Sequence, residues 1–136
     1  MSGPELALES ALLAALAANE AVRESLGDPL RVAGLDSPQP SYPFLEIVRR
    51  QSQPFDAAGY EAFVVTIDMA VVMREEGGGI AQATMAKVRG TLRQADLDME
   101  GWRCVVLTPV FSDTVRQAIG RWRGILRVRA TLEAIG

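Results

Sequence analysis

Two segments of the chain alternate between apolar and polar positions, the pattern of a β-strand with one buried face. In residues 63–71 the positions expected to be buried are Phe63, Val65, Ile67, Met69 and Val71. In residues 121–133 the apolar face is Trp122, Leu126, Val128, Ala130 and Leu132, and the other face is Arg121, Arg123, Ile125, Arg127, Arg129 and Thr131. We therefore expect a long central strand and a closing amphipathic strand.

Apolar residues at three- and four-residue spacing predict two helices. The first carries the stripe Leu8, Leu12 and Leu16, and we expect it to begin at a capping box with Ser2 as the N-cap. Helical character can resume over residues 20–26 before the Gly-Asp-Pro of residues 27–29 stops it. The second helix follows three glycines and carries the stripe Ile80, Thr84, Val88 and Leu92.

Shorter apolar runs predict strands at residues 30–35, 44–48 and 102–111. Between them we expect a proline-rich loop at 36–43, a long exposed connection or hairpin tip at 49–60, a turn at 96–101 and a polar connection at 112–120. Clustered strands with segregated helices favour an α+β fold, a mostly antiparallel β-sheet with two helices packed on one face. The length of 136 residues predicts a single domain over residues 1–136.

Composition narrows the class of protein. With 49% hydrophobic and 23% charged residues the chain should fold, and Cys104 has no partner for an internal disulfide. The leucine-rich start contains Glu5, Glu9 and Glu20 and no preceding basic residue, so we expect it to be neither a signal peptide nor a membrane span, and we expect no membrane partner.

The absence of histidine excludes Ser/His and Cys/His nucleophiles and imidazole metal sites. A Ser/Lys dyad would need Lys87, which is better explained as a solvated side chain. The glycines at 77–79 lack the ending of a phosphate-binding loop, and Asp96 with Asp98 lacks further metal ligands. We predict no catalytic residue, no metal, no cofactor and no enzymatic activity.

Charge is distributed unevenly along the chain. Residues 1–100 carry eight basic and fifteen acidic residues, whereas residues 101–136 carry six basic and two acidic residues. The arginines of residues 121–133 would repel one another unless carboxylates or phosphates meet them. Three interpretations stay open: a solvated outer face, a contact with an acidic neighbouring subunit, or a contact with nucleic acid. The net charge of −3 and only eight aromatic residues favour self-assembly over nucleic acid.

The order of the segments is similar to a known family. An opening helix "PELALESALLAALAANEAV" is followed by "YPFLEI", "FVVTIDMAVV", "AQATMAKVRGTL", "GWRCVVL" and "WRGILRVRATLE". This order resembles the tail-completion or tail-terminator proteins of long-tailed phages and gene transfer agents, over nearly the full chain. The resemblance implies a structural α+β subunit that forms a ring, typically a hexamer, on the end of the tail tube, stops polymerisation and joins tail to head.

The resemblance also implies partners and a location. The partners would be further copies of the chain, the tail tube protein and a head-to-tail connector or neck protein, with DNA only as cargo passing through the ring. Assembly would occur in the bacterial cytoplasm and place the protein in the tail or neck region. A connector or neck protein, or a small nucleic-acid-binding accessory protein, are the alternatives. The candidate subunit-interface residues, from the residue patterns alone, are Arg49, Arg50, Tyr60, Arg121, Arg123, Arg127 and Arg129.

Overall fold

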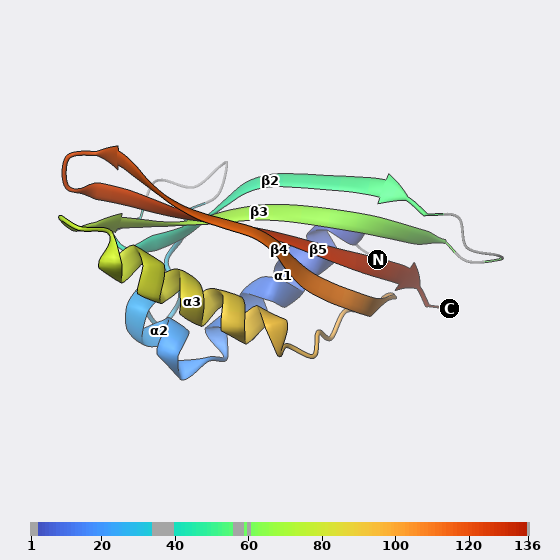
Figure 1. The fold of residues 1–136 in the computed structure, drawn as a ribbon. Helices are drawn as coiled ribbons and strands as arrows, with labels where there is room; N and C mark the ends of the chain where they lie inside the picture. The colour runs from blue at the N-terminus through green and yellow to red at the C-terminus, as the bar shows by residue number, and fades with distance from the viewer. Residues whose placement is uncertain (1–2, 34–39, 56–58, 60, 136) are drawn as a thin grey trace.

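The computed structural model describes residues 3–33, 40–55, 59 and 61–135. Three helices lie under one face of a long five-stranded sheet (Figure 1). The helices are α1 (Pro4–Ala17), α2 (Glu20–Leu26) and α3 (Gly79–Arg93). The strands are β1 (Val32–Ala33), β2 (Phe44–Pro54), β3 (Ala62–Arg74), β4 (Trp102–Ala118) and β5 (Arg121–Ala134).

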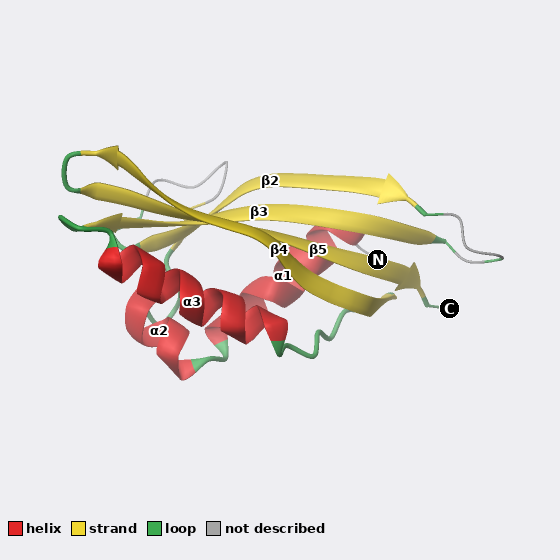
Figure 2. Ribbon diagram, in the orientation of Figure 1, coloured by secondary structure: helices red, strands yellow, loops and turns green. Residues whose placement is uncertain are grey.

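The strands lie in the order β1-β2-β3-β5-β4. The short β1 pairs with β2 in parallel, and the other three pairings are antiparallel. Figure 2 shows the helices gathered on a single face of this sheet, which leaves the opposite face, here called the open face, without helical cover. The predicted α+β class, with a mostly antiparallel sheet and helices on one face, is confirmed.

The core lies between the helices and the two central strands. β3 and β5 pair in register, with Ile67 opposite Val128 and Met69 opposite Leu126, and all four side chains are fully buried. The leucine stripe of α1 packs into the same cluster. The alternation read from residues 63–71 and 121–133 therefore identifies the helix-facing side of both strands.

The predicted helices need one correction and one addition. The N-cap of α1 is Gly3, which has no side chain that could cap the helix. The predicted N-cap Ser2 is therefore wrong, and Ser2 itself lies outside the described residues. The resumed helix over residues 20–26 is confirmed as α2. Its N-cap Asn19 accepts a hydrogen bond from Val22 N at 3.1 Å, and Gly27 follows its last residue.

Helix α3 begins where a carboxylate caps its amide groups. Glu75 accepts hydrogen bonds from the backbone N–H of Ile80 at 2.9 Å and of Ala81 at 2.7 Å. Gly78, at φ +77°, turns the chain beneath the ring of Trp122, where a Cβ atom would lie 2.9 Å from ring carbons. This turn sets α3 directly against β5.

Two expected connections are strands. Residues 49–54 extend β2 and pair with β3, and residues 112–118 extend β4 and pair with β5. The β4–β5 hairpin turns at Ile119 and Gly120 (Figure 1). Neither extension shows a continuous apolar face, but the partner strands satisfy the backbone groups of both. The predicted strand at 30–35 is reduced to Val32–Ala33 in the described part of the chain.

The outer strand β4 is irregular. Its pairing with β5 shifts register between Cys104 and Val106, between Pro109 and Phe111, and between Arg116 and Ala118. Each shift is a β-bulge or a similar irregularity, which interrupts the regular ladder of hydrogen bonds.

Candidate interaction surface on the open sheet face

A polar groove of about 510 Å³ lies on the open face of the sheet. Three strands line it with the residues Arg49, Gln51 and Gln53 of β2, Val64, Thr66 and Asp68 of β3, and Arg127, Arg129 and Thr131 of β5. We call it the open-face groove. The strand pairing explains the grouping, because Arg49 lies opposite Asp68 on one side and Arg127 lies opposite Asp68 on the other.

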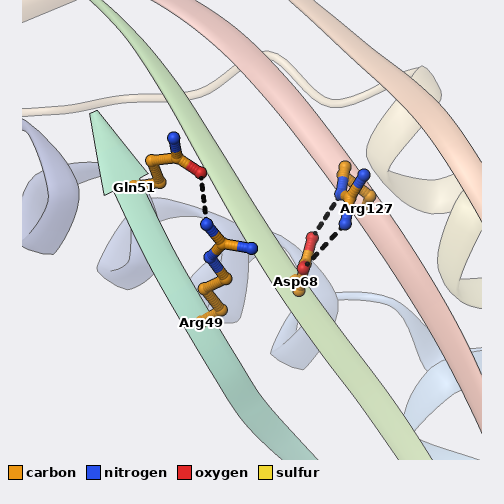
Figure 3. Close-up of polar contacts among 4 residues, drawn as sticks. All are labelled: Arg49, Gln51, Asp68 and Arg127. Carbon is orange, nitrogen blue, oxygen red and sulfur yellow. Dashed lines mark hydrogen bonds and ion pairs between the residues drawn. The ribbon is translucent and has the colours of Figure 1, made fainter. Parts of the chain in front are cut away.

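A bidentate ion pair crosses the floor of this groove. Arg127 donates from Nε to Asp68 Oδ1 at 2.8 Å and from Nη2 to Asp68 Oδ2 at 3.2 Å (Figure 3). Asp68 is only 9% exposed, and its hydrogen bond raises the pKa of Arg127 above the usual arginine range. Two parallel bonds fix the guanidinium plane, so Arg127 is held rigidly against β3.

A second arginine of the row is also paired within the chain. Arg123 donates from Nη2 to Glu46 Oε1 of β2 at 2.9 Å. We call Arg121, Arg123, Arg127 and Arg129 the arginine row. The repulsion expected along this row is therefore relieved within the chain at two of its four arginines, Arg123 and Arg127. The two carboxylates come from the adjacent strand β3 and from β2, which lies beyond it in the sheet.

The other cations of the groove keep their charge exposed. Arg129 is exposed and makes no ion pair with any residue that the structure describes. Arg49 is exposed and donates to the uncharged amide of Gln51 at 2.9 Å, as Figure 3 shows. Arg121 is exposed too, but it lies at the base of the hairpin turn and does not line the groove.

The remaining predicted interface residues lie elsewhere. Arg50 is on the helix-facing side of β2 and donates from Nε to Glu9 Oε1 of α1 at 2.7 Å, and this bond raises the pKa of Arg50. Its neighbour Ser52 bonds the carboxylate of Glu5. Tyr60 lies outside the described residues. Of the seven predicted residues, the groove thus brings together Arg49, Arg127 and Arg129.

An apolar surface along β4 was missed in the sequence. The exposed side chains are Val105, Val106, Val110, Phe111, Val115 and Ile119. A detectable signal exists, since adjacent residues at 105 and 106 and at 110 and 111 are apolar, which a strand with one buried face does not need. β4 is the outermost strand on its side of the sheet, so it pairs with β5 on one side and with no described strand on the other.

The positions considered for chemistry have structural roles. The carboxylate of Glu75 occupies the amides at the start of α3, where a phosphate would have to bind. Lys87 is exposed and donates to Ser25 Oγ at 3.0 Å, which ties α3 to α2. Within the described ranges no three Cys, Asp or Glu side chains gather as a metal site, and no helix is long and apolar enough to cross a membrane.

Residues 10–133 match the family model described as tail completion protein gp17. The chain belongs to this family. It is therefore a structural protein of the tail of a phage-like particle, as the segment order indicated, and it assembles with other proteins of that particle. Membership of a structural virion family argues against an enzyme.

A similar fold occurs in a solved structure titled "Virion of native gene transfer agent (GTA) particle". The superposition has a TM-score of 0.84 at 22% sequence identity and covers 98% of this chain and 100% of the other. No curated protein matches the chain. The shared fold thus extends over the helices and the sheet of this chain.

Proposed function

We propose that this chain is a tail terminator, which assembles as a homohexameric ring on the end of the tail tube, stops tube polymerisation and provides the surface that joins tail to head. Family membership supports a role in completing the tail. The fold shared with a chain of the gene transfer agent virion supports a place in a particle of that kind.

The observation that carries the ring is the exposed apolar surface of β4. Val105 and Val106 are more than half exposed, and Ile119 is 90% exposed. A long apolar edge strand is a site of association, because burying one valine or isoleucine contributes about 1.5–3 kcal/mol. Five such side chains on β4 and Ile119 in the turn that follows it suit a contact that repeats from subunit to subunit.

The role implies a set of partners and a location. The ring would contact the tail tube protein on one side and the connector or neck protein on the other, with DNA passing through only as cargo. Assembly takes place in the bacterial cytoplasm, and the finished protein lies in the tail or neck region. In this proposal residues 1–136 act as one domain and one building block.

Light scattering after size-exclusion chromatography tests the ring, combined with electron microscopy of the protein mixed with purified tail tubes. We expect a concentration-dependent ring and caps on tube ends. The variant Val106→Asp should weaken assembly by about tenfold or more, because it removes a buried methyl surface and desolvates a carboxylate. The control Gln82→Asp places the same charge on the exposed first turn of α3 and should assemble normally.

A wild-type protein that stays monomeric and ignores tube ends refutes the proposal. A head-to-tail connector of the same particle is the nearest alternative. Particle reconstruction separates the two, because a terminator contacts the tube directly.

A further inference from the structure

The connection between α3 and β4 presents three carboxylates in a row. Asp96, Asp98 and Glu100 are exposed, and none forms an ion pair with a described residue. Leu97, which packs against the core, and Met99, which is 8% exposed, alternate with them. The alternation anchors the backbone and points all three acids outward, so we call residues 96–100 the acidic loop. An anchored loop loses little conformational freedom when it binds.

The open-face groove has the complementary charge. Arg127 and Asp68 neutralise each other on its floor, which leaves the exposed guanidinium groups of Arg49 and Arg129 as its net charge. The amides of Gln51 and Gln53 and the hydroxyls of Thr66 and Thr131 add hydrogen-bonding groups around them. Guanidinium groups bind carboxylates in a bidentate geometry, which makes the groove suited to aspartate and glutamate side chains.

We propose that the acidic loop of one copy docks into the open-face groove of the next copy. This inference rests on the proposed ring and assigns the surfaces that join its subunits. In Figure 1 the loop after α3 lies below the sheet on the helix side, whereas the groove is on the open face. Two different patches on opposite sides of a molecule form a head-to-tail contact, and such contacts generate rings when the rotation closes.

The apolar surface along β4 would extend this contact between copies. β4 begins two residues after the acidic loop, so the exposed Val105 and Val106 follow the loop closely along the chain. A contact that combines these side chains with the carboxylates has an apolar centre and a charged rim, the usual composition of a specific protein interface.

A second copy fits the groove better than nucleic acid does. The groove has a carboxylate on its floor, and its lining includes no aromatic side chain on which a base could stack. The complementary charges also belong to one chain whose net charge is only −3. Charge matching of this kind fixes the register of two partners and speeds their encounter.

Two charge-reversed variants test the contact. One reverses the groove with Arg49→Glu and Arg129→Glu, and the other reverses the loop with Asp96→Arg, Asp98→Arg and Glu100→Arg. All five positions are exposed, so each variant should stay folded by circular dichroism. A control, Glu20→Arg with Glu24→Arg, adds positive charge to exposed positions of α2, away from both surfaces.

Each variant alone should assemble at least about a hundredfold more weakly than wild type, because like charges then face each other. An equimolar mixture should regain assembly to within about threefold of wild type, since each reversed surface finds an opposite charge on the other variant. The control should assemble as wild type does.

If either charge-reversed variant assembles as strongly as wild type, or if the mixture stays dissociated, the docking contact is overturned and the proposed ring is not affected. A monomeric wild type overturns both. A groove-reversed variant that assembles normally but loses salt-dependent binding of duplex DNA assigns the groove to nucleic acid and likewise overturns the contact.

Discussion

Gly124 lets helix α3 rest directly on the sheet, and filling it should destabilise the protein. Gly124 is buried on the helix-facing side of β5, opposite Val71 of β3. A Cβ atom there would lie 2.3 Å from Cγ and 2.9 Å from Sδ of Met85. Since Met85 is only 3% exposed and its Cγ is close to the backbone, the side chain cannot escape by rotating its far end into solvent.

The magnitude for Gly124→Ala follows from two opposing terms. Overpacking a closed core costs about 1–3 kcal/mol. Replacing glycine by alanine within a strand returns about 0.5–1 kcal/mol, because the unfolded chain has less backbone freedom to lose. The two ranges bound the net loss in the free energy of unfolding between about 0 and 2.5 kcal/mol, and the closeness of Met85 Cγ places the expected loss in the upper half of that range. Met85→Ala alone should cost about 2–5 kcal/mol through the cavity that it leaves.

Urea denaturation of the wild type, both single variants and the double variant gives the coupling energy. The double variant should be about 1–2 kcal/mol more stable than the sum of the single losses predicts, because the new methyl group enters the space left by Met85. Assembly also adds to stability, so all four proteins should be compared in the Val106→Asp background at several protein concentrations. A Gly124→Ala variant as stable as wild type, or strictly additive losses, would refute this reasoning.

Two further predictions concern single groups. Glu75→Ala should lower the free energy of unfolding by about 0.5–2 kcal/mol, because two amides at the start of α3 lose their acceptor. Thermal melting monitored by circular dichroism measures this loss. An unchanged melting temperature would show that water replaces the carboxylate. Burial raises the pKa of the Cys104 thiol, so iodoacetamide at pH 8 should alkylate the folded protein more slowly than the urea-unfolded chain, as mass spectrometry can follow. Because the folded thiol has the higher pKa, its contribution to stability is present at neutral pH and is lost as the pH rises through the thiol range. Equal alkylation rates in the two states would contradict the burial argument.

Elements that carry one apolar face could be predicted from the sequence. The leucine stripe of α1 and the alternation of β3 and β5 report burial directly, because one face of each element meets the core. The extensions of β2 and β4 gave no such signal. Ser52 and Arg50 occupy helix-facing positions of β2 although they are polar, because they bond Glu5 and Glu9 of α1. These partners are more than forty positions away in the sequence.

The arginine row shows the same limit for the candidate surface. Strand periodicity placed Arg123, Arg127 and Arg129 on one face, and the β5 pairing agrees with it. Which of these arginines is free depends on carboxylates of two other strands, because Asp68 of β3 pairs with Arg127 and Glu46 of β2 pairs with Arg123 across β3. Register between strands that are distant in sequence decides this, and a single sequence does not contain it in a readable form.

The irregular pairing of β4 affects whether unassembled copies of the protein can aggregate. A flat apolar edge strand would form backbone hydrogen bonds with any other exposed strand, and newly made subunits would aggregate. Three shifts of register make β4 irregular, and Pro109 has no N–H to donate to a partner strand. In the proposed ring, a neighbouring subunit would therefore have to fit the side chains of β4 rather than extend its hydrogen-bond ladder, which would keep free subunits from pairing with unrelated strands.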